Sequence, residues 1–400
     1  MQTEDGRQMA DILHTCVHCG LCNATCPTYQ VKGDELDGPR GRIYLIKAML
    51  EGESVSKKTQ LHLDRCLTCR SCETTCPSGV KYGHLVELAR PRVDQQVKRG
   101  LSERLRRAMI RQIVPYPQRF GLLLRLGRLF KPFLPRALSE LVPQISPEIW
   151  PAKPRSYHQH ERKMLILEGC AQAAVAPRIN QAARNIFDRF EITLQSPKGV
   201  GCCGAVSYHL GDEVEARAAA KNNIDRWWPS IESGAEALLV TSSGCAAMIQ
   251  DYPYLFRDDA TYRVRAEKLV KFVCDPSEKL DPAELKKKYR GELKPKQIAF
   301  QAPCSMQHST HTHEHVKRCL RALEFELCAV ADEHLCCGSA GSYSLLQPDL
   351  SNELLDRKLE SLGANKPEMI VSANIGCMMH LARRAEQPVR HWLELIDGES

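Results

Sequence analysis

The 400-residue sequence contains no apolar run long enough to cross a membrane. A spanning helix needs about 18 or more apolar residues, and the apolar run Gly121–Leu124 is interrupted by Arg125. The first eleven residues are polar and lack the apolar core of a secretory signal peptide. We therefore expect neither a transmembrane helix nor export by the general secretory route.

Gly-rich dinucleotide-binding patterns are also scarce. The pattern G-x-G-x-x-G, which brings the backbone close to a pyrophosphate, occurs once, at 199–204, where it coincides with the double cysteine Cys202-Cys203. A flavin or nicotinamide site within this chain is therefore not expected.

Acidic residues are scarce in one segment, residues 98–136. It has eleven Lys or Arg and one acid, Glu103, whereas the rest of the chain has 44 basic and 47 acidic residues. Apolar side chains such as Leu101, Leu105 and Phe130 are interspersed with the arginines. This combination is typical of segments that lie on an anionic membrane surface, and a partner surface or an ordinary linker helix are the alternatives. Basic charge alone is a weak indicator of nucleic-acid binding, so no nucleic acid is expected.

Cysteine, by contrast, is abundant. The chain has nineteen cysteines, an odd number, and no secretory signal. Clustered cysteines in such a chain indicate metal or redox chemistry more than a disulfide framework.

Eight of the cysteines form two matched C-x2-C-x2-C-x3-C-P runs. The runs are Cys16, Cys19, Cys22 and Cys26 before Pro27, and Cys66, Cys69, Cys72 and Cys76 before Pro77. Three thiolates at intervals of three wrap one cubane, and the fourth ligates the other cluster. Cluster one is thus assigned Cys16, Cys19, Cys22 and Cys76, and cluster two Cys26, Cys66, Cys69 and Cys72. Zinc is the alternative, but zinc sites use cysteine pairs with a longer spacer, so we expect two [4Fe–4S] clusters.

The remainder of the chain shows an internal repeat. The first copy contains Cys170, Cys202, Cys203 and Cys245, and the second contains Cys304, Cys336, Cys337 and Cys377. Corresponding cysteines are separated by 134, 134 and 132 residues, a period that indicates duplicated domains. One difference is that His380 stands where the first copy has Met248.

Short apolar strands alternate with helical patterns in both copies, which predicts α/β units with a mainly parallel sheet. Helices are expected near 42–50, 179–190, 212–228, 316–325 and 350–362. The predicted fold class is α plus α/β: a helical ferredoxin-type domain followed by two duplicated α/β domains. The predicted boundaries are 1–97 for the ferredoxin-type domain, 98–160 for a basic linker, and 161–290 and 291–400 for the two copies.

The repeats resemble the cysteine-rich CCG domain of heterodisulfide reductase, anaerobic glycerol-3-phosphate dehydrogenase and lactate-utilisation proteins. The motifs on which this resemblance rests are Cys202-Cys203-Gly204 and Cys336-Cys337-Gly338. Two ferredoxin runs followed by two such units resemble the glycolate oxidase iron–sulfur subunit, as does the segment 37–42 between the runs.

This resemblance implies an iron–sulfur subunit of a glycolate or other 2-hydroxy-acid dehydrogenase, not catalytic alone. It implies FAD-containing partner subunits, a membrane quinone as acceptor, and a peripheral location on the cytoplasmic face of the inner membrane. The alternatives are a lactate or glycerol-3-phosphate dehydrogenase subunit, a disulfide-reducing enzyme, or a non-catalytic metal-binding scaffold.

The eight CCG cysteines are candidate metal ligands, and a further iron–sulfur cluster, zinc or buried thiols all remain open. Three cysteines outside every motif, Cys274, Cys319 and Cys328, are expected in the core. Histidines near the motifs are expected to be solvated or hydrogen-bonded: His14, His18, His62, His308, His311, His313 and His315.

Overall fold

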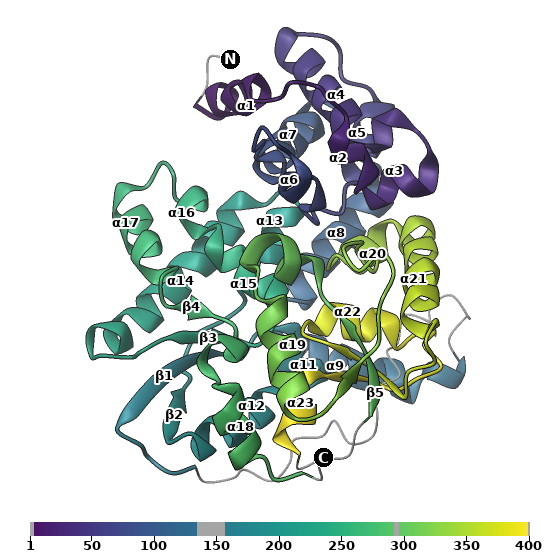
Figure 1. Ribbon diagram of the computed structural model, residues 1–400. Coiled ribbons are helices and arrows are strands. Elements are labelled where there is room, and N and C mark those ends of the chain that lie inside the picture. The colour runs from purple at the N-terminus through teal and green to yellow at the C-terminus, as the bar shows by residue number, and fades with distance from the viewer. Residues whose placement is uncertain (1–3, 134–156, 292–295, 399–400) are drawn as a thin grey trace.

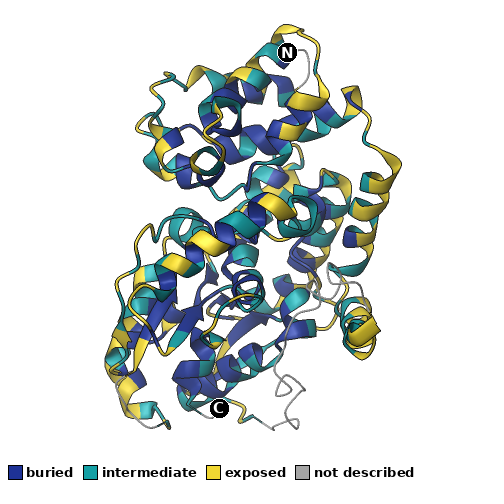
Figure 2. Cartoon of the chain, turned by 90° about the vertical axis from the view of Figure 1, so that its right-hand side faces the viewer, coloured by how far each residue is buried: buried dark blue, intermediate teal, exposed yellow. Residues whose placement is uncertain are grey.

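The computed structural model describes residues 4–133, 157–291 and 296–398. A helical N-terminal part lies at the top of Figure 1, and two α/β units lie below it. Figure 2 shows the buried residues gathered along the strands and the inner faces of the helices, with exposed residues on the outside. No helix in these three ranges is both long and apolar enough to cross a membrane.

The N-terminal part consists of short helices joined by the cysteine loops. They are α1 (Glu4–His14), α2 (Leu21–Ala24), α3 (Pro27–Lys32), η1 (Glu35–Asp37), α4 (Pro39–Glu51), α5 (Lys57–Asp64), α6 (Ser71–Thr75) and α7 (Tyr82–Gln96). Proline opens α3 and α4, where its missing N–H is not needed. The core of this part contains the fully buried Met9, Ile46 and Leu85.

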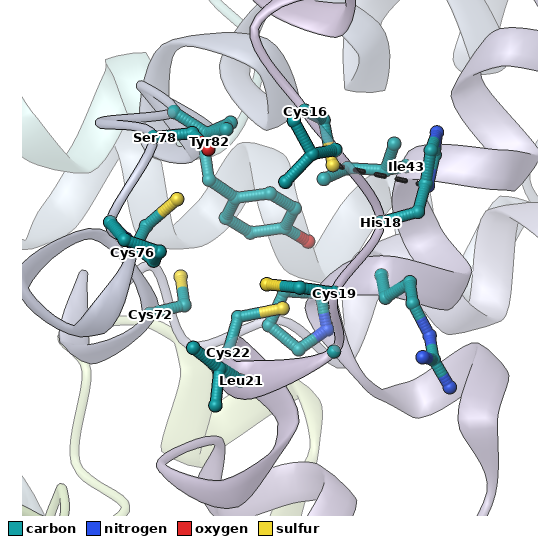
Figure 3. Close-up of a pocket in the computed structure, with 16 residues that line it drawn as sticks. Cys16, His18, Cys19, Leu21, Cys22, Ile43, Cys72, Cys76, Ser78 and Tyr82 are labelled. Atoms are coloured by element: carbon teal, nitrogen blue, oxygen red, sulfur yellow. Dashed lines mark hydrogen bonds between the residues drawn. The ribbon is translucent and has the colours of Figure 1, made fainter.

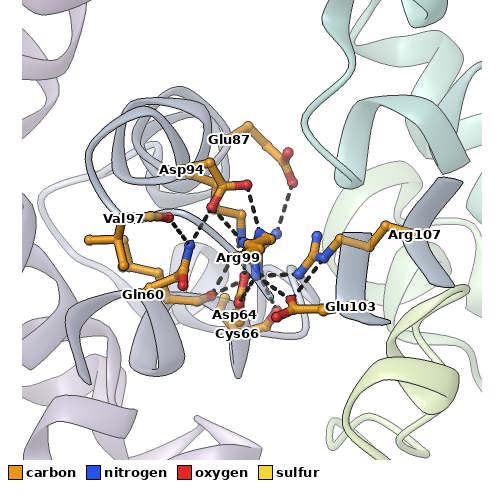
Figure 4. A network of polar contacts seen from close by, with 11 residues as sticks. Gln60, Asp64, Cys66, Glu87, Asp94, Val97, Arg99, Glu103 and Arg107 are labelled. Atoms are coloured by element: carbon orange, nitrogen blue, oxygen red, sulfur yellow. Dashed lines mark hydrogen bonds and ion pairs between the residues drawn. The ribbon is translucent and has the colours of Figure 1, made fainter. Parts of the chain in front are cut away.

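Two helices follow in the basic segment, α8 (Leu101–Ile113) and α9 (Pro117–Leu129), and a short turn, η2 (Lys131–Phe133). An ion-pair network ties the start of α8 to the helical part (Figure 4). Arg99 contacts Asp64 and Asp94 at 2.6 Å each, and Arg107 contacts Asp64 at 3.2 Å. Because Arg99 is largely buried, these pairs fix the direction in which α8 leaves the domain.

The first α/β unit has a four-stranded parallel sheet in the order β2-β1-β3-β4. Its strands are β1 (Arg162–Leu167), β2 (Ile192–Gln195), β3 (Leu238–Val240) and β4 (Val273–Cys274). Its helices are α11 (Ala171–Val175), α12 (Arg178–Arg189), α13 (Ala205–His209), α14 (Glu213–Glu232), α15 (Ser243–Gln250), α16 (Tyr252–Leu255), α17 (Ala260–Leu269), η4 (Pro276–Lys279) and α18 (Pro282–Lys288).

The second unit has the equivalent parallel order, β6-β5-β7-β8. Its strands are β5 (Gln297–Gln301), β6 (Glu326–Leu327), β7 (Met369–Ser372) and β8 (Val389–His391). Its helices are η5 (Met306–Thr310), α19 (His313–Ala322), α20 (Tyr343–Leu346), α21 (Pro348–Gly363), α22 (Ile375–Leu381) and α23 (Trp392–Asp397). The predicted class, a helical part followed by two duplicated α/β units, is therefore confirmed.

The two α/β units share one apolar core. Ile166 and Phe187 of the first unit and Phe300 and Trp392 of the second belong to the same buried cluster. The predicted helices all correspond to helices of the structure, but α19 begins at His313, three residues before the apolar pattern at Val316. Burying this continuous core fixes the two units against each other.

Candidate iron–sulfur sites

Cysteines of both runs line a first cavity in the helical part (Figure 3). Cys16 and Cys19 lie on the loop between α1 and α2, Cys22 lies within α2, and Cys76 ends α6. The structure therefore brings the last cysteine of the second run to the first three of the first run. The spacing of the two runs predicted this grouping for cluster one.

A second cavity is lined by the other four cysteines of the two runs. Cys26 caps the start of α3, Cys66 and Cys69 lie on the loop after α5, and Cys72 lies within α6. Cys72 also borders the first cavity, so α6 forms part of the wall between the two cavities. The sequence grouped these four residues as the ligands of cluster two.

Crowding and burial make both cavities suitable for a positively charged group. Burial and the neighbouring Cys16 raise the pKa of Cys22 to about 11. Burial, and next the charge of Cys304, raise the pKa of Cys69 well above its ordinary value. None of the nineteen cysteines forms a disulfide. Metal ions favour the thiolate forms that such an environment otherwise opposes.

Tyr82 separates the two cavities. Its side chain lines both of them and is only 4% exposed. In Figure 3 the ring extends from the side of Cys76 toward the first cysteine run. Burial raises the pKa of the phenol well above its ordinary value, so the hydroxyl stays protonated. Within the described residues this hydroxyl has no hydrogen-bond partner, so it remains available as a donor beside the sulfur sites.

Charged residues of segment 37–42 support the second cavity from behind. Asp37 is fully buried and accepts a contact of 2.9 Å from His62 and one of 2.8 Å from Arg65. The buried Arg42 donates to Thr28 at 3.0 Å and lies 4.0 Å from the Cys26 sulfur. The sequence marked this segment only as part of a resemblance. The sequence signal for this supporting role was the presence of Asp37 and Arg42 in the segment between the two cysteine runs.

The CCG cysteines gather at the carboxyl ends of the strands in each unit. In the first unit, Cys170 follows β1, and Cys245 lies in α15 after β3. A hydrogen bond with Cys202, and then burial, raise the pKa of Cys170. Cys202 and Cys245 both act on the pKa of Cys203, so the four thiols form one group. A pocket that includes Cys170 and Cys245 is closed on one side by Ile375 of the second unit.

The second unit repeats this arrangement. The sulfurs of Cys304 and Cys336 lie 3.8 Å apart, and Cys336 and Cys377 both act on the pKa of Cys337. The structure thus brings together each of the two predicted sets of four.

The second CCG site, and not the first, packs against the ferredoxin loop. Cys336 belongs to one buried cluster with Leu67, and Cys69 and Cys304 pack against that cluster. The first CCG site lies in a different cluster, which contains no residue of the helical part. Tyr343 of the second unit donates to the carbonyl oxygen of Arg65 at 3.1 Å and holds this contact in place.

The three cysteines outside the motifs and the histidines near the motifs differ in their surroundings. Cys274 and Cys319 are buried, as predicted, but Cys328 is only half-buried because it follows the edge strand β6. His18 lies 3.9 Å from the Cys16 sulfur. His308 bonds to the carbonyl oxygen of His334 at 3.1 Å, a hydrogen-bonding role like the one predicted.

The basic segment is divided between internal and exposed residues. Arg107 and Arg111 form ion pairs with Asp64 and Asp212, so they hold the chain together. The exposed residues of α8, α9 and η2 are both apolar and basic. The large exposed apolar side chains of this segment are Leu101, Leu105, Met109, Tyr116, Leu122, Leu123, Leu126, Leu129, Phe130 and Phe133.

The fold and the cysteine groups define an iron–sulfur protein with one ferredoxin-type part and two cysteine-rich units. Residues 12–80 match the family model described as a 4Fe-4S dicluster domain. Residues 164–250 and 298–382 match the model described as a cysteine-rich domain.

Comparison with curated proteins narrows this class. The chain is 49% identical to the glycolate oxidase iron–sulfur subunit of Escherichia coli K12, over 99% of this chain and 97% of the relative. It is 29% identical to a probable glycolate oxidase iron–sulfur subunit of Bacillus subtilis, over 92% of this chain and 88% of that protein. The chain belongs to the family of glycolate oxidase iron–sulfur subunits.

More distant relatives agree with the fold. A lactate utilization protein A of an Exiguobacterium strain is 26% identical over 54% of this chain and 86% of its own length. A crystal structure of a hypothetical protein from Helicobacter pylori superposes with a TM-score of 0.55, at 7% identity, over 91% of this chain and 68% of that chain. At that identity the likeness concerns the fold alone.

Proposed function

We propose that this chain is the iron–sulfur electron-transfer subunit of a glycolate dehydrogenase complex. The observation that carries the proposal is the series of adjacent cysteine sites, in which two four-cysteine cavities share a wall and the second adjoins a CCG site. Iron–sulfur clusters, when bound, take up and release single electrons. The chain's own residues provide thiolates, bury the sites and hold them next to one another.

The proposed ligands are the two groups assigned from the sequence, with Cys76 completing the first and Cys26 the second. Sulfur spacing favours clusters over zinc. Four thiolates around one zinc, with bonds of about 2.3 Å, lie roughly 3.8 Å apart. Among the described residues, no three cysteine sulfurs lie within 4.8 Å of one another. A larger group than a single ion fits this spacing, and we propose two [4Fe–4S] clusters.

The proposed partners are FAD-containing subunits that oxidise glycolate, and a membrane quinone is the proposed final acceptor. The name and full-length similarity of the Escherichia coli relative support glycolate. The lactate utilization relatives match only about half of this chain, such as 54% for one and 58% for another. Glycolate is therefore favoured over lactate as the substrate of the complex.

We also propose that α8 and α9 place the complex peripherally on the cytoplasmic face of the membrane. The exposed Leu101 (81%), Leu105 (61%) and Phe133 (84%) offer apolar contact area. The exposed Arg104 and Arg106 offer charges that attract anionic headgroups. Together they match the composition of a surface-bound amphipathic segment.

Anaerobic purification of the chain alone and with its flavin-bearing partners tests the proposal. The chain alone is expected to contain iron and sulfide but no glycolate oxidation with an artificial dye. Addition of the flavin subunits is expected to restore glycolate oxidation. Stoichiometric zinc without sulfide, or dye reduction by the chain alone, would contradict the proposal.

A further inference from the structure

The two CCG sites differ in the charge beside their cysteines. The helix after each double cysteine can be aligned through a close approach to glycine. A Cβ at Gly204 would lie 3.1 Å from the Ala216 carbonyl oxygen, and one at Gly338 would lie 2.5 Å from that of Ser351. Ala216 of α14 and Ser351 of α21 are therefore equivalent. Positions two helical turns further along can then be compared.

In the first unit, the position seven residues after Ala216 is Asn223. It is fully buried, accepts a hydrogen bond of 2.8 Å from the Gly201 N–H and donates one of 2.9 Å to the Cys202 carbonyl oxygen. Met248, which is 3% exposed, packs nearby in the same apolar cluster. The first site therefore has a neutral amide and an apolar side chain in these two positions.

In the second unit, the position seven residues after Ser351 is Lys358. It is 4% exposed, and its ammonium donates to the carbonyl oxygens of Asp332 and Glu333 at 2.9 and 3.4 Å. The Glu333 carboxylate pairs instead with Lys317 at 2.8 Å. Among the described residues, no carboxylate is hydrogen-bonded to the ammonium of Lys358. A buried charge without a counter-charge is strongly unfavourable.

Cysteines of the second site are among the groups that act on the charge of Lys358. Burial lowers the pKa of Lys358, and the charges of Cys337, Cys336, Glu333 and Cys304 oppose this lowering. His380 replaces Met248 and lies 3.1 Å from the Ser351 hydroxyl. Burial lowers the pKa of His380 to about 4, so it is neutral at pH 7 and adds no second cation. Lys358 thus places a buried ammonium on the loop that leads to Cys336 and Cys337, where the first unit has the neutral Asn223 at the matched position.

We propose that the second CCG site holds an iron–sulfur group that is reduced by one electron from the cluster beside Cys69, that the first site does not, and that Lys358 stabilises the reduced form of this group. The inference rests on the proposed function, since the electrons arrive from the cluster beside Cys69. A group that gains an electron becomes more negative, and a fixed cation nearby makes that gain more favourable. Cys69 and Cys304 pack against the one buried cluster that contains Cys336, and this provides the adjacency that transfer requires.

The first test uses the full chain in its assembled complex, titrated with a reductant and followed by electron paramagnetic resonance. Beyond the two ferredoxin-type signals, we expect a third redox-active signal that is lost in Cys336→Ser and survives in Cys202→Ser. Loss only in Cys202→Ser, loss in neither, or no third signal would overturn the inference. Absence of the two ferredoxin-type signals would instead contradict the proposed function.

The second test concerns the cation. Lys358→Met is expected to lower the equilibrium constant for reduction of the third signal about tenfold, which is about 59 mV for a one-electron couple. Lys358→Arg keeps the charge and is expected to retain most of the wild-type potential. Asn223→Leu, at the matched position of the first unit, should leave that potential unchanged. An unchanged potential in Lys358→Met, with the third signal intact, would overturn the role of Lys358.

Discussion

For single residues, the spacing of the cysteine runs predicted which cysteines group together. The buried charged residues beside those cysteines could not be predicted. Intervals of three residues require that neighbouring thiols share a loop, so the assignment of Cys76 to the first group followed from spacing alone. The buried partners Arg42 and Lys358 depend on contacts across 16 residues and across the CCG loop. From the sequence alone, an arginine or lysine is expected at the surface, because its burial depends on how the chain packs.

The exchange of fourth ligands gives a direct prediction. Cys76→Ser is expected to damage the cluster held by Cys16, Cys19 and Cys22, and Cys26→Ser is expected to damage the other. The physical reason is that Cys76 lines only the first cavity and Cys26 lines only the second, whereas each belongs to the opposite run. Electron paramagnetic resonance of the two variants measures which signal is lost. Loss of the opposite cluster in each variant would show that the ligands are not exchanged.

At the level of helices and strands, the sequence predicted a basic segment with interspersed apolar residues but not which of its arginines face outward. Arg99 and Arg107 bind the acids of α5, α7 and α8, so they hold α8 in position. Periodicity cannot separate Arg107 from the exposed Arg104 and Arg106, because all three are charged residues of the same helix. The repeats were predicted better, since strand, cysteine and helix recur in the same order in both units.

Membrane contact of α8 is tested with two exposed arginines. Arg104→Gln with Arg106→Gln is expected to weaken binding of the complex to anionic lipid vesicles by about 2 kcal/mol at low ionic strength. Sedimentation with vesicles measures the change, and added salt should reduce the difference. Arg263→Gln with Lys287→Gln removes equal charge from an exposed surface elsewhere and should have little effect. Equal loss in both double variants would mean that only net charge matters.

At the scale of the whole molecule, contacts between distant segments seat the helical part on the α/β units. Arg70 and His84 both contact Asp251 of the first unit, and His84 stacks on Tyr254 with ring centres 3.7 Å apart. Duplication gives no indication of which unit meets which cysteine loop. Which unit packs against which cysteine loop depends on long-range packing. For this reason the sequence could not show which CCG site lies beside the ferredoxin-type part.

Asp251 provides a pH test of this seating. Burial alone would raise its pKa, but the hydrogen bond from His84 and the charge of Arg70 lower it to about 2. Because the folded pKa lies below the ordinary value of 3.8, the stabilisation is present above about pH 4 and is lost as the pH falls toward 2. Asp251→Asn should therefore cost about 2 kcal/mol at pH 7.

Unfolding midpoints of wild type and Asp251→Asn across this range measure the effect. The difference between the two proteins is expected to shrink steadily below pH 4. A difference that is the same at pH 7 and near pH 2 would contradict the role assigned to the ionised carboxylate. Glu353→Gln, in an exposed helical ion pair with Arg357, is the control and should change stability by less than about 0.5 kcal/mol.

The proposed role of this chain is to carry electrons from the flavin subunits toward the quinone. Cys69→Ser in the assembled complex tests it most directly, because Cys69 lies where the second cavity meets the second CCG site. Cys328→Ser, outside every cysteine group, is the control, and retained cluster-one signal confirms assembly. In Cys69→Ser we expect that glycolate still reduces the flavin while quinone reduction stops. Wild-type glycolate-to-quinone turnover in that variant would contradict it.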